Sequence, residues 1–389
     1  PYVKKSFDNY YKDSYKFFVG DELKNVDVTV KEYEIKNIAE FDGLDRVKQH
    51  AINHTVKETR QAMEGLIHDL NIMNSRSGNQ VPFSSINFGT DISPEGRCVI
   101  KAFLEAVDNG VGNENKTAIF PISIFKVKAG INRNSEDKNY DLFKFAQKVT
   151  SKRFFPNFIN LDTAFNYNEK WDINDPNRWY YEPSTMGCRT RVYENRHFEK
   201  SSVGRGNASF TSINIVRLAL KAMKNKKTIE ERKEVFFAEM DKIMSLTANQ
   251  LVERWEWQKT ALAKQFPYVM KYLAEYNEGI KSSDKVENII KHFTLSIGFI
   301  GLAEALVALT STIDSEGNYV KGVHHGESDE AQALGIEIVR HMHLKCKEFS
   351  EKYDLNFGLI ATPAEGLRHK FTDSDKKMFG TYEGVNSRE

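Results

Sequence analysis

The chain has 389 residues, 40% of them hydrophobic and 28% charged, a composition that predicts a soluble globular protein. Its 55 lysines and arginines against 54 aspartates and glutamates give a net charge of +1, so no global field favours nucleic acid or an anionic membrane as partner. The three cysteines, Cys98, Cys188 and Cys346, are odd in number and far apart, which excludes a disulfide framework or a C-x-x-C zinc pattern and indicates a reducing compartment. The longest apolar run, 295–309, is interrupted by Glu304 and falls short of the roughly 20 residues of a membrane span.

The N-terminal part of the chain is predicted to be mainly helical. Residues 1–40 are polar, aromatic and charged, and residues 42–73 carry apolar side chains at helical spacing. His50, His54 and His68 fall in this second helix, but no carboxylate or thiol ligands accompany them in the pattern. The sequence therefore disfavours a metal site there.

Strands and helices then alternate, which predicts an α/β organisation. In the first half we expect strands at 81–89, 118–127 and 154–160, and helices at 94–108 and 139–152. In the second half we expect strands at the end of 204–216, at 295–301 and at 357–361. We expect a helical stretch at 217–263 with a turn at 224–233, and helices at 284–293, 302–310 and after an N-cap at Ser328. Residues 316–325 are expected to form a hairpin or loop. Cys98 and Cys346 fall among apolar residues at helical spacing, so both are predicted to be buried.

Two short stretches carry residue types suited to chemistry. Residues 184–190 (STMGCRT), which follow Pro183, are too short and too broken for a regular helix or strand, so we expect a structured loop that presents one thiol. A surface loop with an incidental cysteine is the alternative. Residues 362–366 (TPAEG) lie between a predicted strand and a helix, where free backbone N–H groups suit a phosphate.

Five stretches, in order along the chain, resemble the catalytic subunit of class III anaerobic ribonucleoside-triphosphate reductases. They are NSRSGNQVPFSSINFGTD (74–91), TMGCRT (185–190), GRGNASFTSIN (204–214), SIGFIGLAEAL (296–306) and ATPAEGLRHKF (361–371). The resemblance is weakest over the first forty or so residues. It implies a ten-stranded α/β barrel of the ribonucleotide reductase and pyruvate formate-lyase type, with a mainly helical part at 1–73, barrel strands and helices at 74–389, and a finger loop at about 183–190.

The same resemblance assigns roles to individual residues. Cys188 would carry a thiyl radical that takes the 3′ hydrogen of a ribonucleoside triphosphate, with formate as reductant, inside a barrel that keeps the radical from water. Asn207 would hydrogen-bond the ribose. The phosphates would be cradled by Thr362, Pro363, Ala364, Glu365 and Gly366. Gln80 and Ser85 line the first matching strand, where substrate binding and a purely structural role both stay open.

Several features of the family have no match in this sequence. They are the glycyl radical stretch and four-cysteine zinc site near the C-terminus, the second active-site cysteine, and the N-terminal ATP cone. The resemblance therefore implies one incomplete barrel domain, inactive alone, with the glycyl radical and zinc outside it. It also implies ATP and dNTP effectors, a radical-SAM activating enzyme, a homodimer, and the cytoplasm of an anaerobic bacterial or phage-infected cell.

Two alternatives belong to other classes. The first is another glycyl radical enzyme, of the formate-lyase or eliminase type, although formate-lyases carry two adjacent cysteines at the finger tip and this chain has one. The second is an inactive nucleotide-binding fragment.

Overall fold

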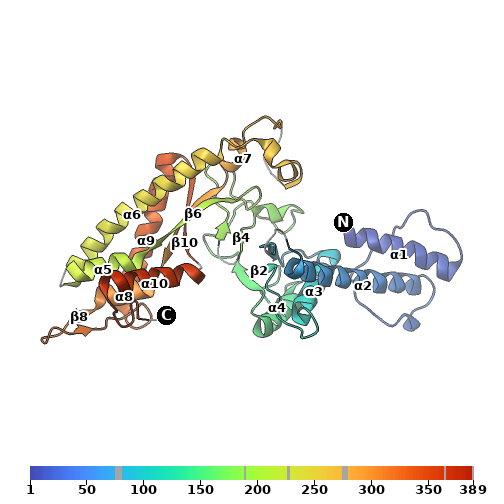
Figure 1. The fold of residues 1–389 in the computed structure, drawn as a ribbon. Coiled ribbons are helices and arrows are strands. Elements are labelled where there is room, and N and C mark those ends of the chain that lie inside the picture. The colour runs from blue at the N-terminus through green and yellow to red at the C-terminus, as the bar shows by residue number, and fades with distance from the viewer. Residues whose placement is uncertain (75–80, 188–189, 226–227, 274–278, 363–364, 388–389) are drawn as a thin grey trace. The chain divides into compact units, whose positions relative to one another are not determined.

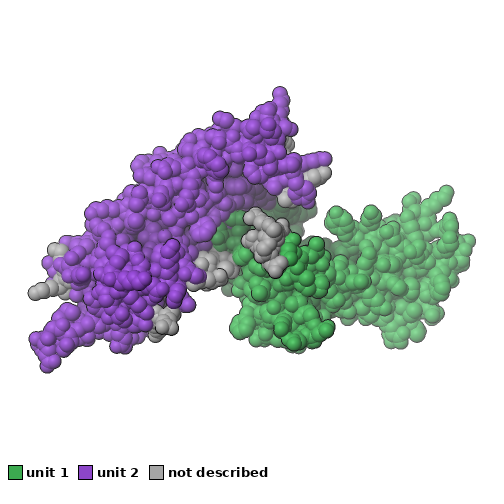
Figure 2. Space-filling model, in the orientation of Figure 1, with its two compact units in different colours: residues 1–191 green, residues 192–389 purple. Residues whose placement is uncertain are grey.

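The computed structural model describes residues 1–74, 81–187, 190–225, 228–273, 279–362 and 365–387. The chain forms two compact units, 1–191 and 192–389 (Figure 2). Each unit holds a three-stranded sheet of parallel strands flanked by helices (Figure 1), so the predicted α/β organisation is confirmed. Among the helices described, none is both long and apolar enough to cross a bilayer.

The first unit begins with two helices that lie side by side, α1 (Tyr2–Val19) and α2 (Gly43–Ile72) (Figure 1). The short 3-10 helix η1 (Ile38–Glu40) lies between them in the chain and contacts α2. Their shared core includes Phe7 and Ala51, both fully buried. On α2, His50 hydrogen-bonds the Ser14 hydroxyl at 2.8 Å, and burial, with His54 nearby, lowers its pKa. No three His, Cys, Asp or Glu side chains in the described part of the chain form a group that could hold a metal.

The sheet of the first unit has the order β1-β2-β3, with β1 at Ser85–Phe88, β2 at Ile122–Val127 and β3 at Asn157–Asn160. Ser93 caps α3 (Pro94–Asn109) by accepting the N–H of Gly96 at 3.0 Å, and Pro94 occupies the first turn, where its missing N–H costs nothing. Together with α4 (Tyr140–Arg153), this helix packs on one face of the sheet around Phe125. The predicted strands at 81–89 and 118–127 begin about four residues late, because Pro82 and Pro121 cannot donate to a ladder.

The sheet of the second unit has the order β10-β7-β6, with β6 at Asn207–Asn214, β7 at Thr294–Ile300 and β10 at Asn356–Ala361. The longer helices of this unit are α5 (Ile215–Asn225), α6 (Ile229–Gln258), α8 (Leu302–Thr310), α9 (Asp329–Tyr353) and α10 (Glu365–Phe379). Leu295 and Ile297 of β7 pack with residues of α5, α6, α8 and α9 in one buried cluster. The turn expected at 224–233 separates two helices: α5 ends at Asn225, and Thr228 starts α6 by forming a capping box with Glu231.

Shorter elements complete the second unit. They are the 3-10 helix η3 (Ala263–Gln265), the π-helix η4 (Val269–Leu273), α7 (Glu287–Ile290), and the strands β8 (Thr312–Ile313) and β9 (Tyr319–Val320). The β8–β9 pair is antiparallel, so the hairpin expected near 316–325 is present, beginning a few residues earlier. Ser328 caps α9 as predicted, by accepting the N–H of Ala331 at 3.1 Å. Cys98 and Cys346 are buried, as predicted, and burial raises their pKa values to about 11 and about 12.

Candidate active site

The segment before Cys188 lies over the helix-free face of the first sheet. This segment, residues 182–187, is called the finger base below. It follows the 3-10 helix η2 (Arg178–Tyr181) and contains β4 (Ser184–Met186), which pairs with β5 (Thr190–Val192) in a two-stranded sheet. The prediction that 184–190 contains no regular strand was therefore wrong. Two three-residue strands form there because backbone hydrogen bonds and tertiary anchors outweigh the weak local pattern.

Side chains of β1 attach the finger base to the sheet. Because side chains alternate along a strand, Ile86 and Phe88 face the core while Ser85 and Asn87 face away from it. The Asn87 amide makes two bonds to the backbone of Thr185: Nδ2 donates to the carbonyl at 2.9 Å, and Oδ1 accepts the N–H at 3.0 Å. The Ser85 hydroxyl accepts the N–H of Gly187 at 3.3 Å. The structure thus places Ser85 against the residue that precedes Cys188.

A buried ion pair attaches the other end of the finger base. Glu182 is 1% exposed and accepts hydrogen bonds from Lys126 Nζ on β2 at 3.1 Å, from the Thr90 hydroxyl at 2.9 Å and from Trp171 Nε1 at 3.2 Å. The buried carboxylate therefore has a cation and two neutral donors around it, which is what burial of a charge requires.

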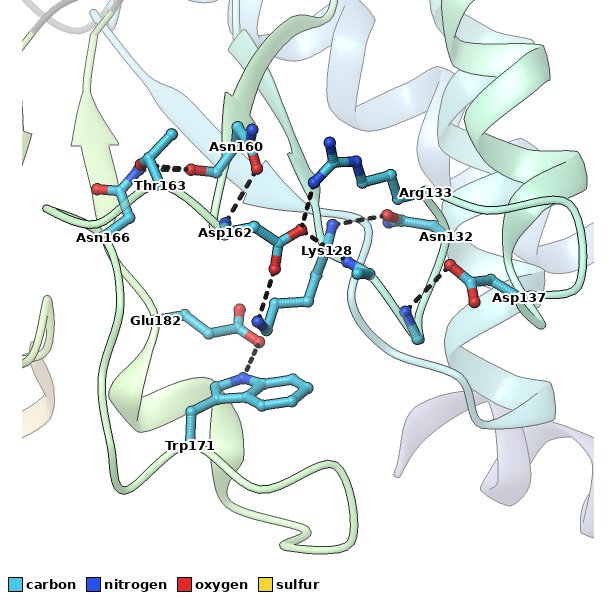
Figure 3. A network of polar contacts seen from close by, with 12 residues as sticks. Lys128, Asn132, Arg133, Asp137, Asn160, Asp162, Thr163, Asn166, Trp171 and Glu182 are labelled. Atoms are coloured by element: carbon cyan, nitrogen blue, oxygen red, sulfur yellow. Dashed lines mark hydrogen bonds and ion pairs between the residues drawn. The ribbon is translucent and has the colours of Figure 1, made fainter.

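A second acidic centre lies beside this one at the carboxyl ends of β2 and β3. Figure 3 shows the Trp171 indole meeting Glu182, with Asp162 above them held by Lys128 and Arg133. Asp162 accepts Lys128 Nζ at 2.8 Å and Arg133 Nη1 at 3.1 Å, and these cationic hydrogen bonds outweigh the opposing effect of burial and lower its pKa. Lys128 Nζ also lies 4.6 Å from the centroid of the Trp171 ring. This network connects the loops at the carboxyl ends of β2 and β3.

In the second unit, Asn207 lies at the start of β6 and its amide serves the sheet. The amide lies 2.9 Å from the Thr294 carbonyl, 3.0 Å from the Ser209 carbonyl and 3.3 Å from the Ser296 hydroxyl. Two of these partners are carbonyls, so the nitrogen is the atom that faces them. These contacts span an irregularity in the β6–β7 register between Asn207 and Ser209. The role predicted for Asn207 at the ribose stays a prediction.

Thr362 lies at the opposite edge of the same sheet, directly after β10. Its hydroxyl is 2.8 Å from that of Ser212, and its N–H donates to the Phe299 carbonyl at 3.1 Å. A side chain on Gly298 would collide with both hydroxyls, so glycine is needed on this strand to let them meet. Asn207 pairs with Thr294 and Ala361 with Phe299, so Asn207 and Thr362 are separated by five to six residues along the strands, about 17–20 Å. The structure does not bring these two predicted site residues together.

Other predicted site residues fall where little or nothing is described. Cys188, Gln80, Pro363 and Ala364 lie outside the described residues. The helix predicted after the TPAEG stretch is present, but α10 begins two residues earlier than expected, at Glu365, so that Glu365 and Gly366 lie in its first turn.

A cavity of about 480 Å³ lies at the carboxyl edge of the second sheet. Its lining includes Glu304 of α8 and Arg368 of α10, together with Asp375, which is 2% exposed and accepts Asn214 Nδ2 at 2.7 Å and Arg217 Nε at 2.6 Å. Glu304 is partly exposed and lines this cavity. Ligands of open parallel sheets commonly bind at such edges.

Comparison with known proteins identifies the family. A family model described as anaerobic ribonucleoside-triphosphate reductase matches residues 1–389. This chain belongs to that family. Curated relatives with that same description are 28% identical over 92% of this chain in Haemophilus influenzae, 27% over 95% in Escherichia coli, and 25% over 100% in enterobacteria phage T4. The chain covers 46%, 48% and 55% of their lengths, so it spans about half of each.

Solved structures share the fold. An anaerobic ribonucleotide reductase aligns over 86% of this chain and 47% of its own, with a TM-score of 0.57 and 14% identity. The Thermotoga maritima enzyme in complex with dATP and CTP aligns over 86% of this chain and 50% of its own, with a TM-score of 0.54 and 15% identity. The mixed α/β fold is therefore that of anaerobic ribonucleotide reductases.

Sequence reasoning missed Asn87, Lys126 and Glu182. Each contacts a partner 56 to 98 residues away, and the local pattern around each is that of an ordinary strand or loop. The alternation within β1 does place Ser85 and Asn87 on one face, which is the only signal that could have pointed to them.

Proposed function

We propose that this chain is the central part of an enzyme that reduces ribonucleoside triphosphates to 2′-deoxyribonucleoside triphosphates, with Cys188 as the radical-bearing residue. The observation that carries the proposal is the finger base, attached at 182, 185 and 187 to one face of a parallel sheet and ending beside Cys188 in the sequence. Family membership over the whole chain supports the reaction. It does not favour the formate-lyase, eliminase or inactive-fragment alternatives.

The chemistry suits a held thiol. A glycyl radical, when present, would supply the radical chemistry, and Cys188 would hold the reacting sulfur. The sulfur then accepts the 3′ hydrogen atom of the ribose, so that a carbon–hydrogen bond breaks and a sulfur–hydrogen bond forms. The 2′ hydroxyl takes up a proton and leaves as water, and formate is oxidised to carbon dioxide and supplies two electrons. A proton completes the new 2′ carbon–hydrogen bond, and the Cys188 thiol returns the hydrogen atom to the 3′ carbon. The part of this chain is to hold the thiol in place and away from water.

We also propose the ten-stranded barrel as the setting for this chemistry. Each unit supplies a sheet of parallel strands with helices on one face and polar or small side chains on the other, such as Ser85 and Asn87, or Ser212 and Gly298. Parallel sheets are normally covered on both faces, and in the first unit the finger base covers part of the helix-free face, so these faces are suited to line a barrel that holds the finger. In this setting 1–389 is one incomplete barrel domain.

For the substrate we propose that the TPAEG loop binds the phosphates. The first turn of α10 begins at Glu365, and the N–H groups of a first helical turn have no intrahelical partners. A side chain on Gly366 would have no described neighbour within 4 Å, so a ligand could approach there. Ribose contacts by Asn207 and substrate contacts by Gln80 belong to the same proposal.

Nucleotides bound to a relative support nucleotide partners. The Thermotoga maritima structure holds dATP and CTP, and another has dATP in its specificity site. By analogy we propose a ribonucleoside triphosphate substrate and ATP or dNTP effectors for this protein. A radical-SAM activating enzyme, a homodimer, the glycyl radical, formate and zinc complete the proposal. The residues described offer no group that could hold the zinc.

The test is deoxynucleotide formation by the protein expressed from its complete reading frame and activated anaerobically. With CTP and formate, we expect dCTP from the wild type and a loss of at least about 10³-fold in Cys188→Ala, since removing a nucleophile or radical carrier removes a whole step. Cys98→Ala is the matched control, because that thiol is buried in the α1–α2 core cluster, and it should retain activity. Product formation by Cys188→Ala would contradict the proposal.

A further inference from the structure

The attachments of the finger base match the spacing of the sheet beneath it. Ser85 and Asn87 are two residues apart on one face of β1, and their partners Gly187 and Thr185 are two residues apart on the finger base. Two residues of extended chain span about 6.6 Å on both sides. Side chains of one segment therefore pair with the backbone of the other in a fixed register.

The Asn87 amide is the part of this register that cannot slip. Its two hydrogen bonds go to the donor and the acceptor of the same residue, Thr185, at 3.0 Å and 2.9 Å. A shift of the finger base by one residue would break both bonds and reverse which side chains face the sheet. The Ser85 hydroxyl, at 3.3 Å from the Gly187 nitrogen, is a longer and weaker contact.

The end of the finger base is also confined from the side. Gly187 adopts φ +61, and a side chain there would reach within 3.2 Å of the Phe83 ring. Phe83 in turn packs edge-to-face on Phe120, with ring centroids 5.0 Å apart. Residues 185–187, which precede Cys188 in the sequence, are therefore held by Ser85, Asn87 and the Phe83 ring.

We propose that Asn87 is a positioning residue for the finger: its amide fixes the register of residues 185–187 over the sheet and so sets where the thiol of the next residue meets the substrate. The effect on catalysis rests on the proposed function, whereas the register is given by the hydrogen bonds alone. A hydrogen-atom transfer needs its two heavy atoms in near contact, and a misplacement of about 1 Å can cost about 10²-fold in rate. Loss of the amide should thus slow the reaction without removing any group that touches substrate.

The chain offers a closely matched control. Asn53 of α2 makes the same pair of bonds to one backbone residue: Nδ2 donates to the Lys36 carbonyl at 2.7 Å, and Oδ1 accepts the Lys36 N–H at 3.0 Å. It lies in the same unit and its partner is outside the finger base. Asn53→Ala therefore removes an equivalent pair of bonds elsewhere, together with the bond that Asn53 Oδ1 accepts from Gln49 Nε2 at 2.9 Å.

The experiment compares Asn87→Ala, Asn87→Asp and Asn53→Ala in the activated protein from the complete reading frame. For both Asn87 variants we expect kcat to fall about 10²-fold with KM little changed and the glycyl radical signal in electron paramagnetic resonance retained. Asp at position 87 can still accept the Thr185 N–H, but its second carboxylate oxygen would face the Thr185 carbonyl and repel it, so Asn87→Asp should not restore kcat. With 3′-deuterated substrate, the kinetic isotope effect on kcat should be larger in the Asn87 variants than in the wild type, because hydrogen transfer becomes slower than the other steps.

Hydrogen exchange of the Thr185 amide tests the register without any turnover. Asn87→Ala should raise its exchange rate about 10-fold or more, whereas Asn53→Ala should leave it as in the wild type. Equal kcat values for Asn87→Ala and Asn53→Ala would overturn the inference. An unchanged Thr185 exchange rate in Asn87→Ala would also overturn it, because the amide would then not hold the register. If instead the activated wild type makes no deoxynucleotide, the proposed function fails, while the exchange rate still tests the register.

Discussion

Replacing Lys126 by Met tests whether its ion pair with Glu182 holds the finger base on the sheet. Lys126 and Glu182 have side-chain exposures of 7% and 1%, with Nζ 3.1 Å from Oε2. The substitution keeps most of the buried stem but removes the positive charge, which leaves the carboxylate with the Thr90 and Trp171 donors. Breaking a buried pair from one side costs about 3–5 kcal/mol.

Lys128→Met is the control for the loss of a lysine charge in the same region. Its partner Asp162 is 19% exposed and keeps Arg133 at 3.1 Å and the Ala129 N–H at 2.9 Å. A pair of this kind, partly exposed and with a second cation, contributes about 1 kcal/mol. The two variants should therefore differ severalfold in the free energy of unfolding that they lose.

The assay is hydrogen exchange by mass spectrometry on peptides covering β2 and the finger base. A loss of 3–5 kcal/mol corresponds to an increase of about 10²- to 5 × 10³-fold in exchange through unfolding of this unit. The double variant Lys126→Met/Glu182→Gln should lose less than Lys126→Met alone. Equal losses for Lys126→Met and Lys128→Met, or an additive double variant, would refute the buried-pair reasoning.

Three further outcomes are expected. Gly187→Ala should destabilise the protein by about 1–2 kcal/mol, because residue 187 has φ +61. Gly112→Ala is the control, since Gly112 has φ +71 but no described neighbour within 4 Å of the added carbon. Urea unfolding should show a larger loss of unfolding free energy for Gly187→Ala than for Gly112→Ala, because only Gly187→Ala also meets the Phe83 ring. Burial and neighbouring cationic side chains lower the pKa of His292 from 6.5 to about 4. Between these two pH values the unfolded chain binds a proton at His292 that the folded protein does not. Stability should fall as the pH drops through this range, by up to about 3 kcal/mol, and a thermal melting series from pH 7 to pH 4 with His292→Gln should show a flatter profile. Cys346, whose pKa is raised to about 12 by burial, should resist iodoacetamide at pH 8 in the folded protein, and mass spectrometry showing its rapid alkylation would contradict that placement.

Local rules recovered much of the secondary structure because the signals lie within a few residues. Ser93 and Pro94 mark the start of α3, and Ser328 marks the start of α9. The apolar face that runs through Cys346 predicted burial of that thiol. Each of these features depends on capping or on periodicity, which act over one or two helical turns.

The site was less predictable because its contacts are long-range. Thr185 is held by Asn87 across 98 residues, and Glu182 by Lys126 across 56. A buried lysine or glutamate also contradicts the usual exposure of its type, so composition argues against finding it in the core. The separation of Asn207 from Thr362 follows from strand register, which the sequence alone did not fix.

The polar face of β1 is best explained by the finger that lies on it. A parallel strand selected only for stability would carry apolar side chains on both faces. β1 instead has Ser85 and Asn87 on one face, and β2 has the nearly buried Lys126 on the same side of the sheet. Each of these polar groups has its partner in residues 182–187, so the departure from the strand pattern marks the docking surface of the finger base. Apolar residues at these positions would preserve the strand and lose the register.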